Sequence, residues 1–99
     1  MSRGAFEKSA HPQAEAEQAR LDFIRTELES CRTFAALAAT ELQIGDRGAA
    51  EHCTRESNKA YDTAVRGLSR VLSAEERRRF DPTLRGLRET LDDLRQRIR

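Results

Sequence analysis

The sequence predicts an all-α protein, folded as an antiparallel up-down-up three-helix bundle whose third helix is kinked or split near Pro82. Two observations favour this class. Charged residues make up 35% of the 99 residues and aromatic residues only 5%, with no Trp, and Ala, Arg, Glu and Leu, which are strong helix formers, dominate the chain. In addition, apolar residues recur at alternating spacings of three and four in three stretches, the period of one face of an α-helix.

The first predicted helix spans residues 12–44. It follows a flexible tail at residues 1–10, so that residues 11–99 form a single domain. Pro12 suits the first turn of a helix, and Ser9 is placed to cap it. The helix is expected to bury one stripe of seven residues, which are Leu21, Ile24, Leu28, Cys31, Ala35, Ala38 and Leu42.

Four further large apolar residues lie on the same helix, about 120° around from this stripe at 100° per residue. The apolar face is therefore about 200° wide, which suits a helix that contacts both other helices. A second interpretation leaves part of this face for a partner, because large apolar groups on a charge-rich surface mark an interface. We therefore predict a binding or dimer contact at Phe34 and Leu37, within the set Phe23, Phe34, Leu37 and Ile44.

Gly45 and Asp46 mark a tight turn into a second helix over residues 47–72, because Gly favours the left-handed end of a helix and Asp caps the next one. Its expected buried side is rich in small residues, which lets the two helices approach closely. The hairpin places Cys31 near Ala60, about two turns from Cys53, so no disulfide is expected. The buried side comprises Ala50, Cys53, Ser57, Ala60, Ala64, Leu68 and Val71, widened by Tyr61, Val65 and Leu72.

A third helix is predicted over about residues 74–97. Ser73 and Glu76 form a capping box at its start. Asp81 and Pro82 repeat the start signal, Asp as the cap and Pro in the first turn, so the helix is expected to kink or divide there. The apolar spacing of four and three continues across the break, through Phe80, Leu84, Leu87, Leu91, Leu94 and Ile98.

The sequence holds no pattern typical of catalysis or of ligand binding. It has no glycine-rich phosphate loop and no Cys-x-x-Cys motif, and two cysteines are too few for a disulfide scaffold. His52 and Glu56 share a helix face, as do His11 and Glu15, but a lone His–acid pair is not a metal site. We expect no catalytic, cofactor or metal residues, and a protein that is not an enzyme.

The run Arg77, Arg78 and Arg79 is the one local cluster of positive charge, and it suggests an alternative function in which the third helix binds nucleic-acid phosphates. Acidic residues are interleaved with the arginines, which is typical of a solvated helix face. The net charge is only +1. Nucleic acid is therefore the less expected partner.

Residues 33–40 form the longest uncharged run, far shorter than the roughly 20 residues that a spanning helix needs. The first 30 residues hold no apolar run behind a basic start, as a signal peptide would. We expect no membrane partner and a cytoplasmic protein.

Residues 34–57 resemble a tetratricopeptide helical hairpin. Phe34, Leu37 and Ala38 match the bulky, Leu and small positions of that family's first helix, and Gly45-Asp46 and Ala49-Ala50 match its turn and the small residues after it. Glu41 stands where the family has an aromatic residue, Asp62 stands where Pro ends the repeat, and no second copy is present. The resemblance implies a hairpin that binds protein. The first expectation for function is thus a protein–protein interaction or structural module, with a protein partner or a second copy as ligand.

Overall fold

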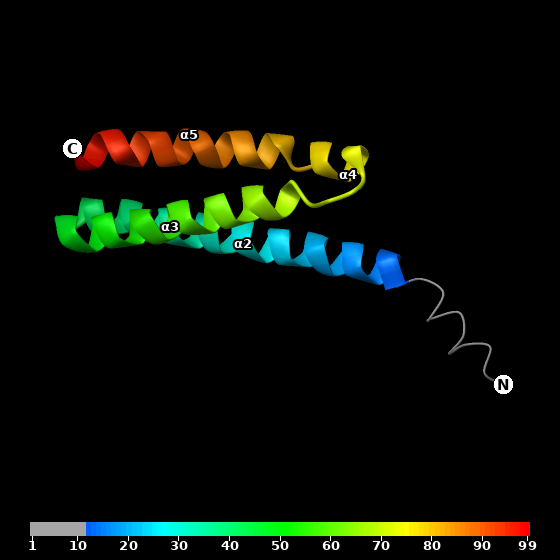
Figure 1. The fold of residues 1–99 in the computed structure, drawn as a ribbon. Helices are drawn as coiled ribbons and strands as arrows, with labels where there is room; N and C mark the ends of the chain where they lie inside the picture. The colour runs from blue at the N-terminus through cyan, green and yellow to red at the C-terminus, as the bar shows by residue number, and fades with distance from the viewer. Residues whose placement is uncertain (1–11) are drawn as a thin grey trace.

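The computed structural model describes residues 12–99, which are helical apart from short connections (Figure 1). Helices α2 (Pro12–Gln43) and α3 (Arg47–Leu68) form an antiparallel hairpin, and α4 (Ala74–Arg78) and α5 (Asp81–Ile98) return along it. Together α4 and α5 make a third helix that is bent by 37° at residues 79–80. The predicted kinked three-helix bundle is confirmed. The predicted tail, the Ser9 cap and the His11–Glu15 pairing lie outside the described residues or depend on residues outside them.

The turn between α2 and α3 has the predicted chemistry. Gly45 adopts a φ of 86°, a conformation that a residue with a side chain rarely adopts. The Asp46 carboxylate accepts a hydrogen bond from the Ala49 backbone N–H at 2.9 Å, and the Asp46 N–H donates to the Glu41 carbonyl at 2.9 Å. Asp46 therefore provides hydrogen-bond partners both for a backbone N–H at the start of α3 and for a backbone carbonyl at the end of α2, groups that have no partner within their own helix.

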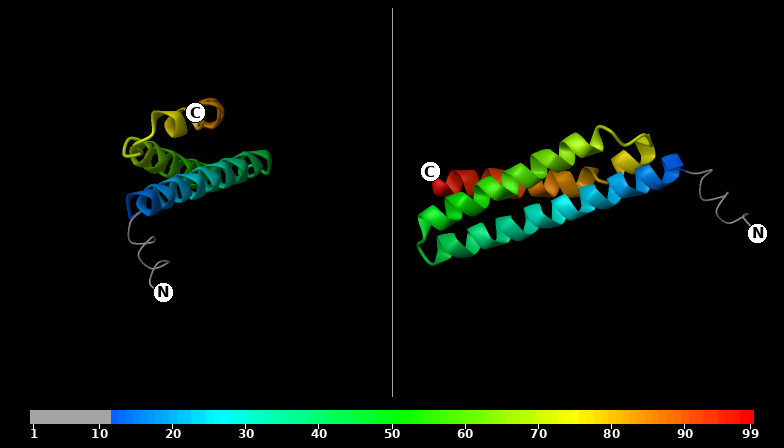
Figure 2. Two further views of the ribbon diagram at one scale, coloured as in Figure 1. Left: turned by 90° about the vertical axis from the view of Figure 1, so that its right-hand side faces the viewer. Right: turned by 60° about the horizontal axis from the view of Figure 1, so that its bottom comes forward.

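The α2–α3 interface is rich in small residues, and these two helices make most of the close backbone approaches in the bundle (Figure 2). Ala38, Ala50 and Ala64 are fully buried. At Gly67 a Cβ atom would lie 3.2 Å from the Cγ1 of Ile24, so the backbone of α3 approaches a buried side chain of α2 directly. Such close approach requires small side chains on both helices.

One polar pair is buried in this interface. Ser57 donates from its hydroxyl to the Cys31 carbonyl at 2.6 Å, and the Cys31 Sγ lies 3.3 Å from the Ser57 Oγ. Both cysteines are free thiols. Cys31 therefore contacts Ser57, which lies one helical turn before the predicted neighbour Ala60.

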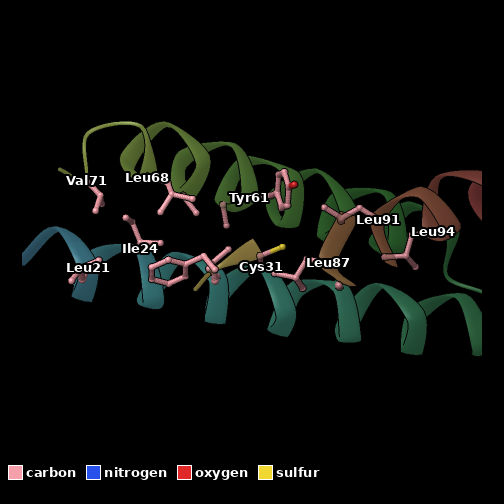
Figure 3. Packing of buried hydrophobic residues seen from close by; sticks show 14 of the residues in the cluster. Leu21, Ile24, Cys31, Tyr61, Leu68, Val71, Leu87, Leu91 and Leu94 are labelled. Carbon is pink, nitrogen blue, oxygen red and sulfur yellow. The ribbon is translucent and has the colours of Figure 1, made fainter. Parts of the chain in front are cut away.

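The third helix packs through larger side chains. Leu87, Leu91 and Leu94 of α5 point toward side chains of α2 and α3 in the space between the three helices (Figure 3). Arg88 lies over the ring of Tyr61, with 4.4 Å between the guanidinium carbon and the ring centroid. Leu91 is inaccessible to solvent, as predicted. A leucine seam of this kind holds α5 further from the hairpin than α2 and α3 are from each other.

The prediction that the second helix reaches Leu72 is wrong, because α3 ends at Leu68. The backbone tightens there, with the Arg70 N–H donating to the Gly67 carbonyl and the Val71 N–H to the Leu68 carbonyl. This turn buries Val71 but leaves Leu72 73% exposed, so Leu72 does not widen the buried side.

A carboxylate from α2 holds the connection after this turn. Glu17 accepts hydrogen bonds from the backbone N–H groups of Leu72 at 2.9 Å and Ser73 at 3.5 Å. Ser73 caps α4 by accepting from the Glu76 N–H at 3.2 Å, as predicted. Glu76, the expected reciprocal member of the capping box, pairs instead with Arg79 at 2.9 Å.

Asp81 does not cap α5, contrary to the prediction. The cap position is Phe80, whose backbone is near-helical and which makes no side-chain capping bond. The chain passes from α4 into α5 with its backbone bonds nearly continuous, so that Asp81 already lies inside the helix. Pro82 has no N–H to donate to the preceding turn, which accounts for the bend just before it.

Candidate interaction surface

One side of α2 is not covered by another helix among residues 12–99 (Figure 2). The α5 side of α2 carries Ala35 and Ala39, which together with Thr83 and Leu87 line a groove between the helices. On the side away from α5, Phe23 is 48%, Leu37 45% and Ile44 69% exposed. Phe34, the fourth predicted contact residue, is half-buried.

The exposed residues belong to a longer stripe that carries no charge. At alternating spacings of three and four, every residue along this side of α2 is apolar or a small hydroxyl residue, and all but the half-buried Ser30 are exposed. We call this stripe the open face of α2, and it consists of Ala16, Ala19, Phe23, Thr26, Ser30, Thr33, Leu37, Thr40 and, in the turn just after the helix, Ile44.

The hydroxyl residues of the open face are partly satisfied within the helix. Thr26 donates to the Asp22 carbonyl at 3.0 Å, and Thr40 donates to the Ala36 carbonyl at 3.1 Å. Burying these two side chains therefore leaves no hydroxyl donor without an acceptor, which removes most of the cost of burying a polar group. These residues can contribute to an apolar contact.

At its N-terminal end the open face borders α3. Phe23 comes close to Gly67, where an added Cβ would lie 3.8 Å from its ring. Together with Ala19, Arg20 and Arg70 the two residues line a shallow hollow of about 260 Å³. Because Gly67 has no side chain, nothing from this position of α3 covers the ring of Phe23, and the ring stays partly exposed.

Charged residues occur only along the two edges of the open face. On the edge toward α3 lie Arg20, Glu27 and Glu41, and on the edge toward α5 lie Glu15, Asp22 and Glu29. Arg20 pairs with Glu17 at 3.4 Å and keeps 43% of its side chain exposed. An apolar stripe with charged edges has the anatomy of a helix-pairing surface.

The predicted phosphate-binding arginines are largely engaged within the protein. Arg77 donates to the backbone carbonyls of Val71 and Leu72, which ties α4 to the preceding connection. Arg79 pairs with Glu76 at 2.9 Å and with Glu75 at 3.8 Å. Arg78 is exposed. The three side chains therefore do not form one basic patch.

A second hollow, of about 350 Å³, lies where the bend between α4 and α5 meets α2. Three arginines line it, and each pairs with an acid: Arg25 with Asp22 at 3.2 Å, Arg32 with Glu29 at 3.3 Å, and Arg79 with Glu76. Arg25 also lies over the Phe80 ring, 5.9 Å from its centroid. Three arginines and three carboxylates thus meet at this hollow, so it carries no net positive charge that would favour an anion.

The groups that could carry chemistry are not assembled into a site in the described part of the chain. Burial raises the pKa of the Cys31 thiol, against the smaller opposing effects of the Ser57 hydrogen bond and of Arg32 and Arg88, so the reactive thiolate form is disfavoured. His52 is exposed, and Cys53 packs partly against the core. No group of three or more metal-ligating side chains occurs within residues 12–99.

None of the helices between residues 12 and 99 combines the length and the apolar character that crossing a bilayer requires. Comparison of the chain with protein-family models, with curated protein sequences and with solved structures gave no match.

Sequence reasoning found the large residues of the open face but missed its continuity. It singled out Phe23, Leu37 and Ile44 by size and grouped with them Phe34, which lies on the edge of the face toward α3. The signal for the whole stripe was the absence of charge at nine successive positions of the heptad period in a chain that is 35% charged.

Proposed function

We propose that this chain is a small helical protein–protein interaction module that binds its partner through the open face of α2. The observation that carries this proposal is the uncharged stripe with three large apolar side chains, each at least 45% exposed. Exposed apolar groups in a continuous row are typical of interaction sites, and a helix face with anchors at heptad spacing is a common recognition mode.

The tetratricopeptide-like residues fit the same proposal, because most of them lie on the hairpin that presents the open face. A cytoplasmic location is part of the proposal and is supported by the two free thiols, since cytosolic conditions keep cysteines reduced.

The alternative, nucleic-acid binding through Arg77, Arg78 and Arg79, has less support. Two of these side chains are engaged by backbone carbonyls or by carboxylates, so binding would have to break those contacts. We expect no shift of DNA or RNA in a gel at physiological salt. A shift at low-micromolar protein that disappears when all three arginines are changed to Glu would favour the alternative.

Affinity capture with mass spectrometry tests the main proposal. The parent and Leu37→Glu are compared with Val65→Glu, a matched control on α3 whose side chain is 40% exposed. We expect one set of proteins with the parent and the control, and its loss with Leu37→Glu at unchanged helical circular dichroism. Equal capture by all three proteins would refute a role for the open face.

A further inference from the structure

We propose that the occupant of the open face of α2 is a second copy of this chain, packed antiparallel about a two-fold axis. This inference rests on the proposed function, because it assigns a partner to the same face. A two-fold contact requires a surface that is complementary to itself. The open face meets this requirement in both shape and charge in one antiparallel register.

In that register each large side chain of the face meets a small one. The residues of a heptad stripe alternate between two positions, a and d. When two such helices pair antiparallel, each a residue lies opposite a d residue of the partner, and each such pair forms one layer. The small residues in the middle of the stripe also meet, so that no layer holds two large groups. The layers are Ala19 with the partner's Ile44, Phe23 with the partner's Thr40, Thr26 with the partner's Leu37, and Ser30 with the partner's Thr33, each repeated by symmetry.

The edges of the face are complementary in charge. On the edge toward α3, Arg20 lies opposite the partner's Glu41, and the symmetry makes this pair twice. On the edge toward α5, Asp22 lies opposite the partner's Gln43, and Glu29 lies opposite the partner's Ala36. The antiparallel register thus contains two attractive pairs and no like-charged pair.

The parallel alternative meets neither requirement as well. In register it places Asp22 against the partner's Glu27 on both edges, a repulsion that offsets the attraction between Glu15 and the partner's Arg20. It also places Phe23 opposite the partner's Phe23 and Ser30 opposite the partner's Ser30. Some layers would then hold two large side chains and others only two small ones. The antiparallel arrangement is therefore favoured by side-chain size and by its two attractive edge pairs, which no repulsive pair offsets.

The face runs along most of α2. From Ala16 to Ile44 it extends for about 42 Å at 1.5 Å per residue. Because the Thr26 and Thr40 hydroxyls already donate within α2, their methyl groups can be buried without an unsatisfied donor. Helices α3 and α5 lie on other sides of α2 and need not move.

Analytical ultracentrifugation is the first test. The full chain is expected to dimerise within a concentration series from low micromolar to near millimolar. Leu37→Glu places two carboxylates in apolar layers of each dimer and should weaken dimerisation about a hundredfold or more, whereas Val65→Glu should not change it. A parent that stays monomeric throughout overturns the inference. The capture experiment above can still succeed in that case, so the two failures are distinguishable.

Charge exchange tests the register without changing an apolar residue. Arg20→Glu and Glu41→Arg should each weaken self-association on the order of tenfold, since each places like charges together twice. A mixture of the two variants should form a heterodimer of parental affinity, because both opposite-charge pairs are restored. If mixing restores nothing, the register is wrong.

Disulfide cross-linking tests the orientation, in a Cys53→Ser background that leaves only the buried Cys31. A mixture of Ala19→Cys and Ile44→Cys should cross-link rapidly on oxidation. Ala19→Cys alone should not, because the antiparallel register separates its two copies by about 37 Å. Rapid cross-linking of Ala19→Cys with itself would show a parallel contact and refute the proposal.

Discussion

The two helix interfaces of this bundle are built from different residues and hold the helices at different separations. Between α2 and α3 the buried groups are mostly small, with Ala38, Ala50, Ala64 and the polar pair Cys31–Ser57, and Ile24 packs against the backbone at Gly67. Between α5 and this hairpin they are leucines and Phe80. The first interface gains its contacts from close backbones, and the second gains them from large side chains that fill a wider space.

This difference predicts opposite sensitivities. A leucine seam loses apolar contact and gains a cavity when a side chain is truncated. An alanine interface has little to lose by truncation, but no room for an added group. The two interfaces should therefore be separable by the direction of the substitution that destabilises each.

The largest effect is expected in the leucine seam. Leu91→Ala, and Leu28→Ala on the facing side of α2, should each lower the free energy of unfolding by roughly 2–5 kcal/mol, because both side chains are buried. Urea denaturation followed by circular dichroism measures the change. Leu72→Ala, at a position that is 73% exposed, should cost less than about 0.5 kcal/mol. Equal values for all three would mean that α5 is not packed as described.

Enlarging the alanine interface should cost somewhat less. Ala38→Leu and Ala64→Leu should each lower the free energy of unfolding by about 1–3 kcal/mol, because both sites are fully buried between close backbones. Ala14→Leu, at an exposed position near the start of α2, provides the control and should be near neutral. If Ala38→Leu is as stable as this control, the two helices are not in close contact at that point.

Substitution of two glycines, Gly67 in α3 and Gly86 in α5, tests the same difference between the interfaces with smaller expected effects. Gly86 in α5 has no atom within 4 Å of an added Cβ, so Gly86→Ala should stabilise the protein by about 0.5–1 kcal/mol through chain entropy. At Gly67 the added Cβ would lie 3.2 Å from the Cγ1 of the fully buried Ile24, and the contact should cancel or reverse this gain. Thermal melts of both variants give the order. A more stable Gly67→Ala than Gly86→Ala would contradict the close approach.

The smallest effect concerns pH. Burial raises the pKa of the Cys31 thiol above its unfolded value, so the native state holds the proton more tightly. The resulting stability is fully present below the pKa of the thiol in the unfolded chain and is lost as the pH rises through the raised pKa of the native state. Unfolding measured from neutral to alkaline pH should show a steeper decline for the parent than for Cys31→Ala. Parallel curves for the two proteins would exclude this linkage.

The proposed interaction surface was only partly predictable from the sequence. The surplus of large apolar groups on the first helix indicated a partner side, and Phe23, Leu37 and Ile44 are exposed as that interpretation requires. Phe34 is half-buried, because its position on the helix turns it toward α3. The sequence alone did not say which flank of α2 the third helix covers, so it did not separate the open face from the core.

The helices, their stripes and the first turn were determined by the sequence itself. Helix propensity, the heptad period, Gly45 and the Asp46 cap act within a few residues of the chain, so they can be read without the fold. The tertiary structure decided three further features. Helix α3 ends at Leu68, Glu17 accepts hydrogen bonds from the backbone of the connection after it, and the chain continues from α4 into α5 through Phe80 without a side-chain cap. The Glu17 contact joins residues 55 positions apart in sequence, and the path of the chain through residues 69–80 depends on how the third helix packs back on the hairpin.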